Sequence, residues 1–321
     1  MRAQFVASVI GAALALLPSD TSRVIQTAGT PVRESRIQAG TASLYSREVG
    51  KGQPLVILHG GPDFDISYML PEMDRFATGY RLIYYDQRGR GRSADGVRPE
   101  DVSLVSEIAD LEIVRRNFQL NSVALVGHSW GAVLALEYAL RHPERVSHLV
   151  LMNPAPASAT DVAVFRKAYL QQLGADMDRQ RQIASSAAYK DADPVAVAER
   201  YRIHFKHALA RPEHYEALMA TMKAAFTRQG KDGIIKARAV EDRLMADTWQ
   251  IDGYDLLPKL RTLDIPTLVI SADHDFIPVE TADHIARAIP KARFITLRNC
   301  GHFSFLECGA DVRAAFDEFF R

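Results

Sequence analysis

The serine at position 129 stands in a sequence setting that suits nucleophilic catalysis. It is the centre of the pentapeptide GHSWG, residues 127–131, which follows a β-rich run and precedes a helix-like segment. A serine on such a tight strand-to-helix turn has an exposed hydroxyl, and the flanking glycines let the backbone bend without a collision of Cβ atoms. The setting predicts that Ser129 attacks a carbonyl carbon and that the backbone amide of Trp130 donates to the resulting oxyanion.

A pair of glycines could supply a second donor to that oxyanion. The sequence HGGP, residues 59–62, directly follows the β-rich run PLVIL, residues 54–58. Tandem glycines allow a backbone amide to face the serine turn, so we assign the second oxyanion donor to Gly61. His59 lies at the same strand end, where a histidine is more often a structural hydrogen-bonding residue than a catalytic base.

A general base and its orienting acid are found near the C-terminus. His302 follows a β-rich run and is predicted to take the proton of Ser129 and then to protonate the leaving group. A carboxylate must hold the histidine in the right tautomer, and both Asp273 and Asp275 follow another such run. We favour Asp275, because the loop after such a strand needs only a short distance between acid and histidine. We expect the side chain of Asp273 to form hydrogen bonds with the backbone of its own loop.

Each of these motifs falls at the end of a short apolar run, and these runs alternate along the chain with helical segments. This arrangement explains how the residues could meet. From residue 40 onward, runs rich in Val, Ile, Leu and Tyr alternate with helical patterns. This alternation is typical of an α/β protein with a mostly parallel sheet and helices on both faces. The predicted strands are 54–58, 81–86, 122–127, 148–152, 267–270 and 293–297, and the predicted helices include 103–118, 132–140 and 311–320.

The alternation stops between residues 157 and 260, where the sequence is almost wholly helix-like. So long a helical segment cannot lie in the sheet between two of its strands, so we predict an inserted helical cap over one end of the sheet. The predicted organisation is therefore a core in two parts, residues 40–156 and 261–321, around a cap at residues 157–260.

The charge balance and motif content restrict the partners. The 321 residues include 39 Lys and Arg against 39 Asp and Glu, which argues against nucleic acid or an anionic membrane as partner. The chain has no metal-ligand pair of the H-x-x-x-H or C-x-x-C type and no phosphate-binding glycine motif, so we expect no metal and no cofactor. The run DQRGRGRS, residues 86–93, is interpreted as a turn that braces the loops around the site. The expected partner is a small-molecule or short-peptide substrate.

Two cysteines, Cys300 and Cys308, lie close together in the sequence. They are too few for a disulfide framework and lack metal-site spacing. They could pair, but we expect two small buried thiols.

The N-terminal residues 1–22 form a separate segment. The apolar run 5–17 is too short to span a bilayer comfortably and resembles the hydrophobic region of a signal peptide. The segment is either a signal for export to the periplasm or the exterior, or an unstructured extension ahead of a cytoplasmic enzyme. Neither alternative includes a stable membrane span.

Over residues 40–321 the chain resembles the α/β-hydrolase superfamily, in which the nucleophile, acid and histidine occur in the order Ser129, Asp275, His302. The combination of HGGP, DQRGRGRS and GHSWG is similar to the proline iminopeptidase branch, whose members are serine aminopeptidases with a helical cap. The resemblance implies a catalytic triad of these three residues and oxyanion donors at Gly61 and Trp130.

Some residues depart from that branch. Asp63 follows HGGP where the family usually has glycine, and His128 precedes Ser129, as it does in many carboxylesterases. The family's cap carries a Trp-x-x-Trp-Glu element whose glutamate binds the substrate's free α-amino group, and residues 157–260 lack this element. Glu199 or Glu213 could take the place of that glutamate.

These features predict a serine hydrolase that acts through an acyl-enzyme. The first expectation is an aminopeptidase that releases a small N-terminal residue such as proline, and the alternative is a hydrolase of small carboxylic esters or lactones. A more remote alternative is a non-catalytic, ligand-binding member of the fold. An aminopeptidase needs a buried carboxylate to pair with the substrate ammonium, whereas an esterase pocket can be wholly apolar.

Overall fold

A mixed sheet of nine strands runs through the part of the chain described by a computed structural model, residues 23–25 and 31–321. The strand order is β1-β2-β3-β5-β4-β6-β7-β8-β9. All neighbours from β5 to β9 in this order are parallel, and the first three strands pair antiparallel, which confirms the predicted mostly parallel α/β sheet. The strands are β1 (Arg23–Ile25), β2 (Val32–Ala39), β3 (Ala42–Val49), β4 (Gln53–Leu58), β5 (Tyr80–Tyr85), β6 (Val123–His128), β7 (Val146–Met152), β8 (Thr267–Ala272) and β9 (Ala292–Leu297).

The sheet begins earlier in the chain than the predicted core boundary at residue 40. Strand β2 ends at Ala39 and pairs along its whole length with β3. Its sequence VRESRIQA is mostly polar and only some of its residues are buried, so it lacks the apolar run that marks the central strands. The six predicted strands correspond to β4 to β9, with bounds that differ by at most two residues.

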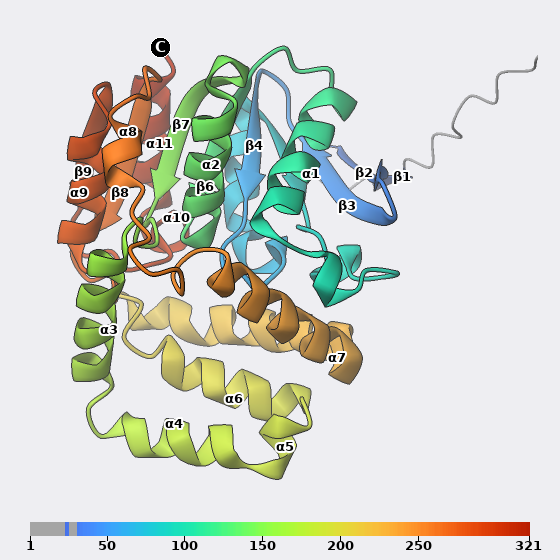
Figure 1. Ribbon diagram of the computed structural model, residues 1–321, viewed down its shortest axis with the longest axis vertical. Helices are drawn as coiled ribbons and strands as arrows, with labels where there is room; N and C mark the ends of the chain where they lie inside the picture. The colour runs from blue at the N-terminus through green and yellow to red at the C-terminus, as the bar shows by residue number, and fades with distance from the viewer. Residues whose placement is uncertain (1–22, 26–30) are drawn as a thin grey trace, which may run out of the picture.

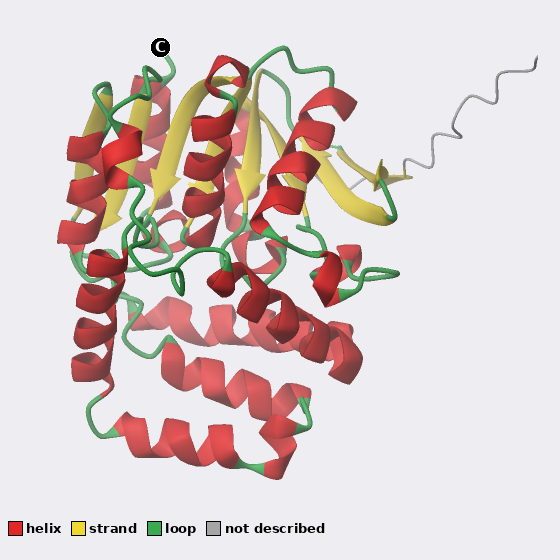
Figure 2. Ribbon diagram, viewed as in Figure 1, coloured by secondary structure: helices red, strands yellow, loops and turns green. Residues whose placement is uncertain are grey.

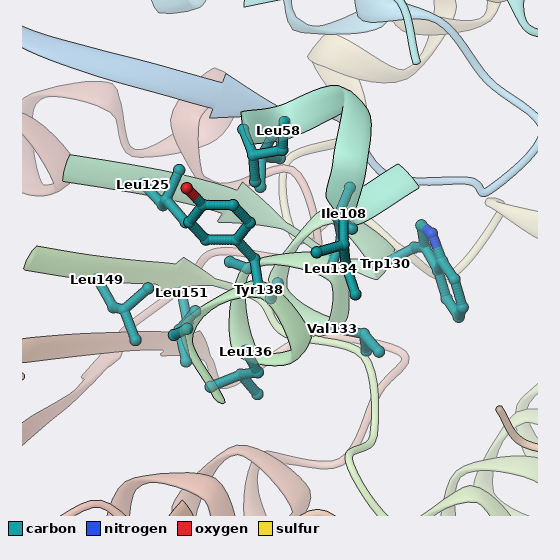
Figure 3. Packing of buried hydrophobic residues seen from close by; sticks show 14 of the residues in the cluster. Leu58, Ile108, Leu125, Trp130, Val133, Leu134, Leu136, Tyr138, Leu149 and Leu151 are labelled. Carbon is teal, nitrogen blue, oxygen red and sulfur yellow. The ribbon is translucent and has the colours of Figure 1, made fainter. Parts of the chain in front are cut away.

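Helices cover both faces of the sheet and make two apolar layers. The side chains of β4 alternate between them, since Val56 and Leu58 pack with α1, α2 and α9, while Leu55 and Ile57 pack on the side of α11. Figure 3 shows side chains of α2 and of the neighbouring strands packed together in the first layer. The helices of the sheet layers are α1 (Leu104–Asn117), α2 (Trp130–Arg141), α8 (Leu257–Leu260), α9 (Val279–Ala288), α10 (Ser304–Glu307) and α11 (Gly309–Phe319).

The segment between β7 and β8 is helical and leaves the sheet. It lies beyond the carboxyl ends of the parallel strands, where the arrowheads point in Figure 2. Its two connections to the core run side by side, because the amide of Ala159 donates to Tyr254 O at 2.7 Å and that of Leu256 to Ala157 O at 3.0 Å. The helices of this insertion are α3 (Ala159–Leu173), α4 (Asp176–Ser185), α5 (Ala187–Lys190), α6 (Pro194–His204) and α7 (Tyr215–Ala246) (Figure 1).

No helix in the described ranges is both long and apolar enough to cross a membrane. The predicted signal or extension at residues 1–22 lies outside those ranges.

Candidate active site

Ser129 occupies the turn between β6 and α2 in a conformation that few residues adopt. Its φ is 54° and its ψ is −120°. A Cβ atom on Gly127 would collide with the carbonyl oxygen of Gly131, and one on Gly131 with the carbonyl oxygen of Leu58. Only glycine therefore fits on either side of the serine, and the turn presents Ser129 to a cavity at the carboxyl ends of the strands.

His302 and Asp275 form a buried pair at the same cavity. The Nδ1 atom of His302 lies 2.9 Å from Oδ1 and 3.1 Å from Oδ2 of Asp275. A carboxylate at Nδ1 fixes the proton there, so Nε2 is the nitrogen left free to accept a proton, and Ser129 lines the same cavity as His302. Asp273 instead contacts the exposed ring of His274 at 2.8 Å, so the geometry selects Asp275 as the partner of His302.

Asn153 and Glu307 hold this pair in place, and sequence reasoning missed both. The side-chain amide of Asn153 donates to Asp275 Oδ2 at 2.8 Å, and its carbonyl oxygen accepts from Ser304 at 2.6 Å. The carboxylate of Glu307 accepts from the backbone amide of Gly301 at 2.6 Å, next to His302. The position of Asn153, directly after a buried strand, was the available signal in the sequence.

Replacing Asn153 by alanine is expected to lower kcat roughly 10- to 100-fold with little change in KM, because a hydrogen bond to a charged group contributes about 1.5–3 kcal/mol. Steady-state kinetics on one chromogenic substrate measure this. The matched control is Asn121→Ala, since Asn121 is exposed. A kcat within twofold of the wild type would show that Asp275 needs no support from Asn153.

A chain of hydrogen bonds fixes the HGGP turn. The amide of Gly60 donates to the Tyr68 hydroxyl at 2.7 Å, and that hydroxyl lies 2.8 Å from Nδ1 of His128. His128 Nε2 lies 2.9 Å from the carbonyl oxygen of His302, and burial holds the pKa of His128 well below its ordinary value. His128 is thus a neutral link between the two turns, and the Gly60 amide is already engaged. The amide of Gly61, whose φ is +123°, is the next donor along this turn.

His59 is structural, as its position at a strand end indicates. It is fully buried, its Nε2 accepts from the amide of Gln87 at 3.0 Å, and burial lowers its pKa to about 3. The DQRGRGRS run also has the predicted bracing role. Arg92 donates to Asp86 at 2.9 Å, and Arg90 pairs with Glu107 at 2.8 Å in the interior.

The cavity in front of Ser129 has a volume of about 290 Å³. Both the core and the helical insertion contribute its walls. Its aromatic lining consists of Phe64, Tyr68, Phe165, Tyr189, Tyr201, Phe205, Trp249, Phe276 and Phe303. Its charged lining consists of Asp63, Glu241, Arg166, Arg200 and Arg238.

The carboxylates of the cavity are not the ones predicted from the sequence. Glu199 is about half exposed, 3.9 Å from Arg202, and Glu213 is exposed, and neither lines the cavity. Asp63, the residue that departs from the family motif, and Glu241 of α7 line it instead. Glu199 and Glu213 face solvent because the packing of the insertion turns other positions of its helices toward Ser129.

Burial favours the neutral form of both cavity carboxyls. It raises the pKa of Asp63, although the Tyr201 hydroxyl donates a hydrogen bond to that side chain. It raises the pKa of Glu241 to about 8, and the nearby Asp63 contributes in the same direction. A cation in the cavity would restore the charge of these groups.

Cys300 and Cys308 form a disulfide, so the expectation of two free thiols is wrong. Both side chains are buried, and their Cα atoms are 6.2 Å apart. The helical turn of α10 folds the chain back and brings the two positions together. The bridge closes the loop that carries His302.

Replacing both cysteines by serine is expected to lower the free energy of unfolding by about 2.5 kcal/mol, the chain-entropy value for a cross-link with a sequence separation of 8. Urea denaturation without reductant measures this. The wild type with reductant should lose the same amount. An unchanged unfolding midpoint in the double variant would contradict the stabilising role of the bridge.

Comparison with known proteins agrees with this fold. Residues 53–307 match the family model described as alpha/beta hydrolase fold, so the chain belongs to the α/β-hydrolase family and is a hydrolase. Within the family it is proline iminopeptidase-like. It is 26% identical to the proline iminopeptidase of Saccharolobus solfataricus over 267 residues, which cover 81% of this chain and 82% of that protein.

Two solved structures share the fold. The proline iminopeptidase of Mycobacterium smegmatis superposes with a TM-score of 0.63 at 23% identity, over 89% of this chain and 97% of that one. Est816, described as an N-acyl homoserine lactone degrading enzyme, superposes with a TM-score of 0.65 at 20% identity, over 88% of this chain and 99% of that one.

Proposed function

We propose that the protein is a serine aminopeptidase that releases a small N-terminal residue, such as proline, from a substrate with a free amino terminus. Ser129 attacks the carbonyl carbon while His302 takes its proton and Asp275 stabilises the imidazolium. The amides of Gly61 and Trp130 donate to the oxyanion. His302 then gives the proton to the leaving nitrogen, the C–N bond breaks, and water hydrolyses the ester on Ser129.

The observation that carries this proposal is the pair of carboxyl groups in the cavity. Asp63 lies two residues after Gly61, the proposed oxyanion donor, and its Oδ1 lies close to Gly61. No side chain in residues 31–321 forms an ion pair with Asp63 or donates a hydrogen bond to Glu241. Glu241 thus has no partner among these side chains and Asp63 has only the Tyr201 hydroxyl, and the ammonium of an N-terminal residue would supply both carboxyls with a cation.

The direct test compares kcat/KM for three substrates: a prolyl arylamide, the same arylamide with an acetylated nitrogen, and a short-chain aryl ester. We expect the free amine to exceed its acetylated form by about 100-fold or more, because acetylation removes a charge-assisted hydrogen bond and leaves the carboxylates unpaired. A preference for the acetylated arylamide would reject the aminopeptidase.

The second candidate function is the hydrolysis of small esters or lactones. It is supported by the aromatic walls of the cavity, which suit an apolar acyl group. If this is the function, the aryl ester is hydrolysed rapidly and neither prolyl arylamide is cleaved. Hydrolysis of the ester alone does not decide between the two, because activated esters are intrinsically more reactive than amides.

A further inference from the structure

Arg200 presents an unused guanidinium to the cavity. It lies on α6 and lines the cavity with Asp63 and Glu241. Within residues 31–321, no carboxylate oxygen lies within 4.0 Å of its nitrogens, and no carbonyl accepts a hydrogen bond from them. The guanidinium nitrogens of Arg200 remain accessible, whereas Nη2 of Arg238 is buried without a hydrogen-bond partner in the described part of the chain.

Aromatic rings hold this guanidinium in place. Its central carbon lies 5.5 Å from the ring centre of Tyr189 and 5.8 Å from that of Tyr201. Such cation–π contacts support the cation while its N–H groups remain free to donate. Arg238 lies 4.0 Å from the ring centre of Tyr189 and donates to the backbone oxygen of the same residue at 2.9 Å. Arg238 is thus engaged, and Arg166 is exposed, so Arg200 is the half-buried cation of the cavity whose N–H groups are free to donate.

The charge balance of the cavity favours an anionic group on the substrate. Arginine keeps its charge in proteins, so Arg200 and Arg238 are both cationic. The cavity lining holds three arginines, including Arg166, against the two carboxyls of Asp63 and Glu241, and burial raises the pKa of Glu241 to about 8, so the cavity at neutral pH holds more positive than negative charge. A substrate whose only charged group is an ammonium would favour the ionised form of the two carboxyl groups, but it would give Arg200 no anionic partner.

We propose that Arg200 binds a free carboxylate of the substrate, so that the cavity accepts a small zwitterion, a dipeptide with a free amino and a free carboxyl terminus. This inference rests on the proposed aminopeptidase function and narrows its substrate class. Hydrolysis breaks the single peptide bond, with the hydroxyl of water going to the acyl carbon and its hydrogen to the leaving nitrogen, so two free amino acids are released.

The size of the cavity agrees with so small a substrate. Its volume of about 290 Å³ lies just below the usual range for ligand pockets, roughly 300–1,000 Å³. A guanidinium and a carboxylate can form two parallel hydrogen bonds, which a C-terminal amide cannot match. A dipeptide amide or a longer peptide would therefore lose the contact with Arg200.

The test compares kcat/KM for prolyl-alanine and prolyl-alaninamide with the full-length protein. The wild type should prefer the dipeptide roughly 10- to 100-fold, the range for a hydrogen bond to a charged group. Arg200→Gln should bring this ratio to about 3 or below, because glutamine carries no charge and cannot form the charge-assisted pair of hydrogen bonds. The matched control is Arg202→Gln on the same helix, since Arg202 pairs with Glu216 at 2.6 Å, does not line the cavity and should leave the ratio unchanged.

Three results would overturn the binding of a substrate carboxylate by Arg200 or the proposed function on which it rests. Equal hydrolysis of the dipeptide and its amide by the wild type would overturn the inference without the need for any variant. A preference that survives in Arg200→Gln would overturn the role of Arg200. A wild type that cleaves a prolyl arylamide but shows no preference for the free carboxylate rejects only this inference, whereas failure to cleave any prolyl substrate rejects the proposed function as well.

Discussion

Replacing His302 by alanine is expected to lower kcat for a prolyl arylamide at least about 10,000-fold, with KM within a few-fold of the wild type. We propose His302 as the base because its Nδ1 lies 2.9 Å from Oδ1 of Asp275 and because it lines the same cavity as Ser129. Without it, the serine hydroxyl has no acceptor for its proton and the leaving nitrogen has no donor. Steady-state kinetics with purified protein measure this loss.

The matched control is His274→Ala, because His274 is exposed and bonds to Asp273 rather than to Asp275. We expect its kcat to be unchanged. The same contrast separates the two candidate acids, since Asp275→Asn should reduce kcat severely and Asp273→Asn should not. Retention of more than a tenth of the activity in His302→Ala would contradict its role as base.

Replacing Glu241 by glutamine is expected to lower kcat/KM for a prolyl arylamide about 100-fold or more, because truncating one partner of a buried charge pair costs roughly 2–5 kcal/mol. The loss for a short-chain aryl ester should be far smaller, since the ester brings no ammonium. Asp242→Asn is the control, because Asp242 is the exposed neighbour on the same helix. Equal losses on both substrates would contradict ammonium recognition by Glu241.

The pH dependence of kcat/KM in the wild type should also reflect the ionisation of Glu241. Burial raises the pKa of Glu241 from its ordinary value of 4.5 to about 8, so this carboxyl gains its charge only as the pH rises through that value. The kcat/KM for the prolyl arylamide should therefore rise with pH in this range, and Glu241→Gln should lack that rise. An identical pH profile in both proteins would exclude Glu241 as the titrating group.

Stability gives an independent check on the same residue. Because the folded-state pKa of Glu241 is raised, its contribution to stability falls as the pH rises from about 4.5 to 8, where the unfolded chain has released the proton that the folded protein still holds. Glutamine carries no charge, so Glu241→Gln should be no less stable than the wild type at pH 8. A loss of activity together with retained stability separates a binding role from a structural one.

The sequence predicted the central strands and three site residues because their signals are local. Ser129, Asp275 and His302 each follow an apolar strand, and the carboxyl ends of parallel strands meet at one edge of the sheet. The antiparallel strands β2 and β3 escaped prediction because both carry many polar residues and are buried only in part, so neither has the continuous apolar run of the central parallel strands.

The cavity charges could not be predicted, because they depend on how helices pack. Glu241 is one of several acidic residues on the long helix α7, whose path bends at Gly230, with a φ of 64°. Which of them faces Ser129 depends on that bend and on the packing of α6 against α7. Likewise, the pairing of Cys300 with Cys308 depends on the turn of α10, which the spacing of the cysteines does not reveal.

Labelling with a fluorophosphonate probe, followed by mass spectrometry of the peptides, tests directly whether Ser129 is the nucleophile. We expect one adduct per chain, on the hydroxyl of Ser129, and no labelling of Ser129→Ala. Labelling that persists in Ser129→Ala, or an adduct on a different residue of the wild type, would contradict the assignment of Ser129 as the nucleophile.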